Sequence, residues 1–97
     1  MSTSNEYKEY ILEQLDLLDK ITTRKMMGEY LLYYNEVLLG GIYDNRLLVK
    51  IVKTNEKYNM DKQLPYLGAK PMYIIQELDN KEVLKKIILD TYEGLQN

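Results

Sequence analysis

The side chains that could do chemistry in this sequence are carboxylates, lysines and tyrosines, because histidine and cysteine are both absent. Without histidine the chain lacks the commonest general base and the commonest metal ligand. Without cysteine it can form neither a thiolate zinc site nor a disulfide. The serines, Ser2 and Ser4, lie at the start of the chain, and no glycine-rich phosphate-binding motif occurs. We therefore predict a protein that is not an enzyme and that uses no cofactor and no metal ion.

Paired carboxylates are the remaining route to catalysis or metal binding. Glu29, Glu36 and Asp44 fall on or beside the expected strands, where two of them could meet and do acid–base work. However, 15 acidic residues in a short chain make chance proximity common, and no calcium-loop motif fixes their spacing. These carboxylates therefore do not change the prediction.

The basic residues concentrate in the middle of the chain. Residues 46–70 carry six Lys and Arg against two acidic residues, whereas residues 1–19 carry five acidic residues against Lys8. A basic segment with interleaved tyrosines could follow phosphates and stack on bases, so one alternative function is binding of nucleic acid or a phosphorylated small ligand. Against this, lysines also keep a loop hydrated, and the formal net charge of −2 opposes long-range attraction. The candidate anion contacts are Arg24, Lys25, Lys50, Lys53 and Lys57.

Tyrosine is the only aromatic residue type: there are ten Tyr and no Phe or Trp. A tyrosine buries its ring but needs a partner for its hydroxyl, which suits half-buried positions and interfaces. In 30–34 apolar or aromatic residues occupy both faces of the expected strand, so two helices can cover only one of them. The second face requires the 54–71 loop, a second copy of the chain, or a partner protein. Tyr33 and Tyr34 are therefore candidate partner contacts.

A helix is predicted at each end of the chain. The first spans about 5–19, with a Thr3–Glu6 capping box and Ser4 or Asn5 as alternative caps. The last opens on an Asp79–Glu82 capping box, and its apolar residues recur at helical spacing. They are Leu84, Ile87, Ile88, Thr91, Tyr92 and Leu95.

Strands are predicted between the helices. The four runs 21–27, 29–34, 37–43 and 46–53 are separated by Gly28 and by short polar turns at 35–36 and 44–45. Gly40-Gly41 indicates a bulge or a place of close packing on the backbone. Residues 54–71 are irregular, with a short helical turn expected around 56–61, and 72–78 is a fifth strand. The order predicts one α+β domain over 1–97, with a mostly antiparallel sheet (a four-stranded meander plus a fifth strand) flanked by N-terminal and C-terminal helices.

The run Arg24-Lys25-Met26-Met27-Gly28 resembles the N-terminal domain of TfoX (Sxy) proteins. The resemblance continues through 31–34 and 47–50 and returns at 71–73, so it covers about Glu6 to Leu95 in order. Met27 stands where the family usually has Phe, and Glu29 stands where a second Gly is common. We interpret Met26 and Met27 as core residues, and Gly28 as a backbone requirement at the strand junction.

The resemblance implies an α+β fold and a link to regulation of natural competence or transcription. Full-length TfoX regulators carry a second, helical domain resembling DNA-binding modules, whereas this sequence ends at Asn97 without one. We therefore expect a stand-alone interaction module that contacts a transcription-related protein, with a homodimer as a further form. No apolar run is long enough to cross a bilayer, and the first ten residues are unlike a signal peptide, so we expect a cytoplasmic protein without membrane contact.

Overall fold

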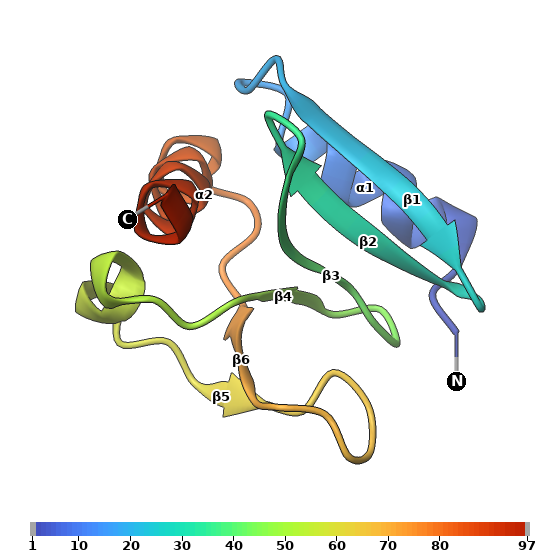
Figure 1. Cartoon of the computed structure of the whole chain (residues 1–97). Coiled ribbons are helices and arrows are strands. Elements are labelled where there is room, and N and C mark those ends of the chain that lie inside the picture. Colours follow the sequence, from blue (N-terminus) through green and yellow to red (C-terminus); the bar gives the residue numbers. More distant parts are fainter. Residues whose placement is uncertain (1, 97) are drawn as a thin grey trace.

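The computed structural model describes residues 2–96; Met1 and Asn97, the ends of the predicted domain, lie outside the described residues. Two helices and a six-stranded sheet form an α+β fold, which confirms the predicted class (Figure 1). The sheet gains its sixth strand from a two-residue pairing inside the predicted loop. In chain order the elements are α1 (Asn5–Gln14), β1 (Ile21–Met26), β2 (Glu29–Tyr34), β3 (Val37–Ile42), β4 (Leu47–Val49), the 3₁₀ helix η1 (Lys53–Tyr58), β5 (Lys62–Gln63), β6 (Met72–Ile75) and α2 (Lys81–Gln96).

The strands lie in the order β1-β2-β3-β4-β6-β5, and every neighbouring pair is antiparallel. The predicted meander is therefore confirmed, with β6 added at its β4 edge. Each hairpin of the meander turns through two residues with positive φ: 27–28, 35–36 and 44–45. Such turns match the right-handed twist of the flanking strands, which is why the meander can be closed so tightly.

Both predictions for Gly40-Gly41 hold. The register shifts between Leu32, which pairs with Gly40, and Tyr33, which pairs with Leu38, so Leu39 is the extra residue of a β-bulge. A Cβ on Gly40 would lie 2.8 Å from Val49 Cα, and one on Gly41 only 2.6 Å from the Tyr30 carbonyl oxygen. Side chains are thus excluded where the bulged strand approaches its neighbours.

Several predicted boundaries are wrong by a few residues. The first helix ends at Gln14 rather than 19, and hydrogen bonds between residues three apart, such as Leu18 N–H to Leu15 O, follow it. Acidic side chains near this end disfavour a longer helix, because they oppose the helix dipole. The fourth strand ends at Val49 rather than 53, and η1 begins at Lys53. The helical turn is therefore 53–58 rather than 56–61, and the strand expected over 72–78 ends at Ile75.

The caps also differ from the predicted capping boxes. Ser4, one of the alternatives, caps α1 by accepting a 3.0 Å bond from Tyr7 N–H. Thr3 is instead buried, with its hydroxyl 2.8 Å from Glu29 Oε1 and 3.1 Å from the Ile42 carbonyl oxygen. At α2, Asn80 rather than Asp79 accepts from the backbone, through Val83 N–H at 3.2 Å.

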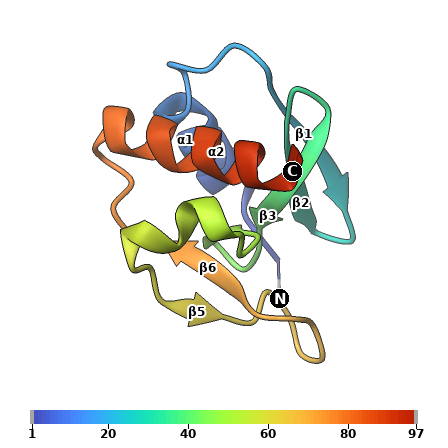
Figure 2. The same ribbon diagram turned by 60° about the vertical axis from the view of Figure 1, so that its left-hand side comes forward.

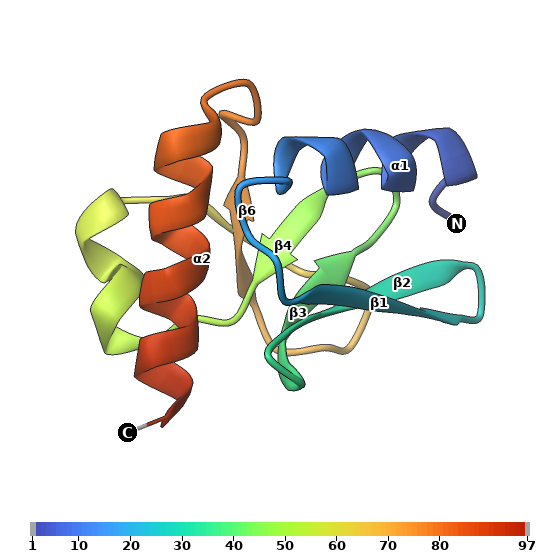
Figure 3. The ribbon, with the colours of Figure 1, turned by 90° about the horizontal axis from the view of Figure 1, so that it is seen from above.

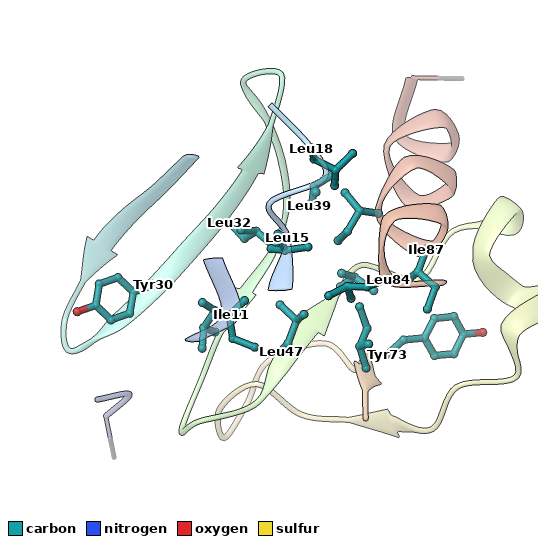
Figure 4. Close-up of a cluster of buried hydrophobic side chains, with 14 residues drawn as sticks. Ile11, Leu15, Leu18, Tyr30, Leu32, Leu39, Leu47, Tyr73, Leu84 and Ile87 are labelled. Atoms are coloured by element: carbon teal, nitrogen blue, oxygen red, sulfur yellow. The ribbon is translucent and has the colours of Figure 1, made fainter. Parts of the chain in front are cut away.

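One core lies between the inner face of the sheet and both helices. Figure 3 shows α1 above the β1–β2 hairpin, and Figure 4 shows the buried side chains that α1, α2 and the sheet contribute. The predicted stripe of α2 is confirmed at four positions that are all buried. The core comprises Ile11, Leu15, Leu18, Tyr30, Leu32, Leu39, Ile42, Leu47, Val49, Tyr73, Ile75, Leu84, Ile87 and Ile88.

The buried side chain of Asn55 ties η1 to the rest of the domain, beside α2 (Figure 2). Its Nδ2 donates to the Lys50 carbonyl oxygen and to Thr91 Oγ1, both at 2.9 Å, and its Oδ1 accepts from Val52 N–H at 3.1 Å. All hydrogen-bonding groups of the amide therefore have partners, as a fully buried polar side chain requires.

Candidate functional site

The outer face of the sheet, opposite the helices, is covered over only part of its width. Leu48 on β4 is 0% exposed, and Tyr43 on the β3–β4 turn is only 6% exposed. Residues 65–71 lie beside this half of the face, where Pro65, Tyr66 and Pro71 line a hollow together with Tyr43. On β1 and β2 the outward residues stay open: Arg24 and Met26 are exposed, and Tyr33 is half-buried. The loop thus covers one half of the face and leaves the β1–β2 half, with its free β1 edge, uncovered.

Arg46 holds the covering loop in place. Its guanidinium donates to Gln63 Oε1 at 2.8 Å and to the carbonyl oxygens of Leu64 and Pro65 at 3.0 and 3.2 Å. Its Nε donates to the Tyr43 carbonyl oxygen at 3.1 Å. Arg46, which belongs to the predicted basic segment, therefore has a structural role, because its N–H groups donate to the protein itself.

The structure brings Arg24 and Tyr33 together on the open half. Thr22 pairs with Tyr33 and Arg24 with Leu31, so Arg24 and Tyr33 are diagonal neighbours on the outer face. They line a shallow hollow of about 290 Å³ together with Thr22, Thr23 and Glu36. Lys25 is exposed, but strand alternation turns it to the opposite face.

Tyr34 lies on the inner face and packs against the core. Its ring meets Tyr92 edge-on, with centroids 5.0 Å apart, and the Tyr92 hydroxyl accepts a 2.7 Å bond from Asn35 Nδ2. Of the two tyrosines named from the sequence, only Tyr33 is placed to contact a partner on the outer face.

The basic residues of 46–70 do not form one surface. Lys53 and Lys57 lie on η1, where Lys57 Nζ is 3.1 Å from Asp90 Oδ2. Lys50 lies across the sheet and lines a different hollow, of about 670 Å³, together with Lys70. Tyr43, Pro65, Tyr66 and Met72 are among the other residues that line this hollow. The three candidate lysines are thus divided between two faces.

The β1–β2 turn carries a feature that sequence reasoning missed. The predictions that Met26 and Met27 belong to the core are wrong: they are 47% and 93% exposed. Met26 points to the outer face by strand alternation, and Met27 is the first residue of the turn, with a φ of 52°. The backbone role of Gly28 holds, since its φ is 85°. The sequence feature that could have indicated this exposure is an apolar residue directly before a turn glycine.

Leu67 repeats this arrangement at the tip of the covering loop. It is 95% exposed and directly precedes Gly68, whose φ is 90°. The same loop exposes Leu64 and Tyr66. Seven large apolar side chains are exposed in residues 2–96, and five of them lie at the end of β1, on the β1–β2 turn or in the 64–67 segment.

Three tyrosines have a raised pKa, and for Tyr7 the causes are burial and then the nearby Tyr10. Burial, and after it the hydrogen bond and negative charge of Asp90, raise the pKa of Tyr58 to about 12. Burial, followed by the nearby Tyr66 and Glu29, raises the pKa of Tyr43 above its ordinary value. All three hydroxyls therefore stay protonated at neutral pH, where they can donate hydrogen bonds but not act as bases.

Within residues 2–96, no three acidic side chains gather where a metal ion could bind. The carboxylates considered above are used structurally in part: Glu29 Oε1 accepts from Thr3 Oγ1 and from Asp44 N–H. No helix in the described part of the chain has the length and apolar character needed to span a membrane.

Comparison with known proteins agrees with this architecture. Residues 13–92 match the family model of the TfoX N-terminal domain, which is most of the chain. The chain is also 28% identical over 80 residues to an uncharacterised 12.7 kDa protein encoded in the trpE 5′ region of Spirochaeta aurantia. That alignment covers 80% of this chain and 70% of the relative. The chain belongs to the TfoX N-terminal domain family.

Proposed function

We propose that this chain is a non-enzymatic interaction module of the bacterial cytoplasm, which contacts a transcription-related protein through the open half of its sheet. The contact surface comprises the β1–β2 turn with Met26 and Met27, and the adjoining strip with Arg24 and Tyr33. The family link to competence and transcription regulation supports the class of partner, and the surface itself supports the mode of action.

The observation that carries the proposal is the conformation of Met27. A residue with a Cβ costs about 1–2 kcal/mol in the left-handed region. An exposed side chain that packs on nothing cannot offset that cost within the fold. Strained, exposed positions of this kind cluster where a protein binds something, and a methionine adapts well to an apolar surface of a partner.

The strip beside the turn extends this contact. Tyr33 offers a half-buried ring, and Arg24 offers a guanidinium that forms no ion pair within residues 2–96. Tyrosine and arginine are the residue types that most often dominate binding at protein interfaces. The free edge of β1 could also take up a strand of the partner, but the side chains alone suffice for the proposal.

The test is affinity capture from nuclease-treated lysate of the native host, with the full chain and two variants, Met27→Asn and Tyr33→Glu. We expect a transcription-related protein that both variants lose. Burial of a methionine is worth about 1.5–3 kcal/mol, so Met27→Asn should weaken the purified complex at least tenfold.

Leu17→Asn is the matched control, because Leu17 is 43% exposed and follows α1, at the opposite end of that helix from the β1–β2 turn. It should retain the partner. If the same proteins are captured by the parent chain and by both variants, the open half of the sheet is not the contact surface. If the chain captures only itself and sedimentation shows a dimer that Tyr33→Glu dissociates, the partner is a second copy.

A further inference from the structure

A second surface lies on the covered half of the outer face, between the end of β4 and the loop that Arg46 holds. Its volume of about 670 Å³ falls within the range of about 300–1,000 Å³ that is usual for small-molecule sites. From the lining residues, we infer that this hollow binds a small organic anion in which a phosphate monoester is attached to a planar ring.

The positive charge of the hollow comes from Lys50 and Lys70. Val49 pairs with Tyr73, so Lys50 directly follows the last residue of β4, and Lys70 lies two residues before β6 begins at Met72. The two lysines therefore lie next to the same ends of β4 and β6, and both line the hollow. The position of Lys50 is fixed, since its N–H donates to the Leu39 carbonyl oxygen at 2.8 Å.

Neither lysine has a counter-ion within residues 2–96. In residues 2–96 the ion pairs involve Lys8, Lys57 and Lys81, and no carboxylate lines the hollow. Two ammonium groups that line one hollow, with no carboxylate beside them there, favour a ligand with two negative charges. A phosphate monoester carries close to that charge at neutral pH.

The walls supply contacts for a planar group. The rings of Tyr43 and Tyr66 pack against each other, with centroids 6.0 Å apart and planes tilted by 55°, so they form one aromatic patch on the wall of the hollow. Tyr43 is buried and fixed against Gly41, whereas Tyr66 is 61% exposed and free to adjust. Because the Arg46 hydrogen bonds hold the loop backbone in place, the site exists without a ligand and binding need not first order the loop.

The same geometry favours a small molecule over nucleic acid. A strand or duplex needs cations in a row along its phosphates. Here Arg46 is directed at loop carbonyls, Lys57 pairs with Asp90, and only two cations line the hollow. The proposal does not depend on the interaction surface of β1 and β2, and either can fail without the other.

The experiment is a titration of the isotope-labelled full chain, followed by backbone amide NMR shifts at low salt. The probes are adenosine 5′-monophosphate, adenosine, inorganic phosphate and a short single-stranded oligoadenylate. We expect saturable shifts around Lys50, Tyr66 and Lys70 with the monophosphate, and much weaker ones with adenosine or phosphate alone.

Three variants place the site. Lys50→Met and Lys70→Met keep the apolar stems and should each weaken monophosphate binding about tenfold, the usual effect of removing one charged hydrogen bond. Tyr66→Ala should weaken it about fivefold or more through lost stacking. Lys62→Met is the matched control, since Lys62 is exposed on β5 outside the hollow, and it should bind like the parent.

Four outcomes would overturn the inference. They are no shifts with the monophosphate, equal binding of adenosine, equal binding of inorganic phosphate, and an oligoadenylate that binds far more tightly than the monophosphate. The last would identify a nucleic-acid surface instead. Loss of monophosphate binding in Lys62→Met as well would show that the charge of the chain, rather than this hollow, is responsible.

Discussion

Replacing Met27 by asparagine should make the protein more stable while removing its proposed contact. The turn between β1 and β2 is Met27-Gly28, with φ values of 52° and 85°. Two positive φ values in a two-residue hairpin loop are the type I′ pattern, for which Asn-Gly is the preferred sequence. Met27→Asn therefore gives the turn the residues that its backbone already favours.

The expected gain follows from the exposure and conformation of Met27. Because its side chain is 93% exposed, the substitution removes almost no packing. A left-handed residue with a Cβ costs about 1–2 kcal/mol, and asparagine tolerates this region by bonding to its own backbone. Recovery of about half of that cost gives an increase of about 0.5–1 kcal/mol in the free energy of unfolding. For a domain of this size the melting temperature should rise by about 2–8 °C.

The assay is urea unfolding followed by far-UV circular dichroism, with parent and variant compared at one pH. The midpoint should move to higher urea with an unchanged slope. Met27→Ala is the control: it also removes the exposed side chain but keeps the left-handed cost, so its midpoint should stay at that of the parent. If Met27→Asn is no more stable than Met27→Ala, the argument from strain is wrong. If both variants are less stable than the parent, the methionine makes a stabilising contact in the fold.

Three further outcomes follow from the described contacts. Tyr34→Glu should lower the free energy of unfolding by at least about 2 kcal/mol, because it places a carboxylate against the core. Tyr33→Glu should change it by less than about 0.5 kcal/mol. Equal effects in chemical denaturation would mean that the two faces are misassigned. Asn55→Ala should lower the free energy of unfolding by about 2–4 kcal/mol, because it leaves buried backbone groups without hydrogen-bond partners. A near-neutral result would contradict the buried network. The pKa of Tyr58 is raised to about 12 from 10.0, so its protonated form is favoured in the fold. That stabilisation is complete below pH 10 and is lost as the pH rises toward about 12. Tyr58→Phe should flatten this alkaline loss of melting temperature. An unchanged profile would show that burial and the bond to Asp90 do not raise the pKa of Tyr58 in solution.

Much of the fold could be predicted because its turns have local sequence patterns. Asn35-Glu36 and Asp44-Asn45 are polar pairs between apolar runs, and Gly28 ends the first run. These positions fix strand lengths and neighbours within the meander. The two-residue strand 62–63 could not be predicted, because pairing there depends on where β6 lies rather than on any alternation of its own.

The candidate site was harder to predict because alternation separates two faces without saying which is buried. For residues 30–34 both faces are apolar, so the sequence alone left Tyr33 and Tyr34 equivalent; contact of Tyr34 with Tyr92 resolves the choice. The role of Arg46 was hidden for a similar reason. A basic residue in a basic segment indicates an anion contact, and only the folded chain shows loop carbonyls around its guanidinium.

The spacing of the strands along the chain has a consequence for how the domain forms. Strands β1 to β4 are joined by two-residue loops, whereas 22 residues separate the end of β4 from the start of β6. Closing that longer loop costs about 2 kcal/mol more in chain entropy than closing a two-residue turn. We therefore expect the meander to assemble first, and the segment from η1 to β6 to dock in a later step. The hollow bordered by Lys50 and Lys70 exists only after that step, so a bound anion should slow unfolding while leaving the refolding rate unchanged.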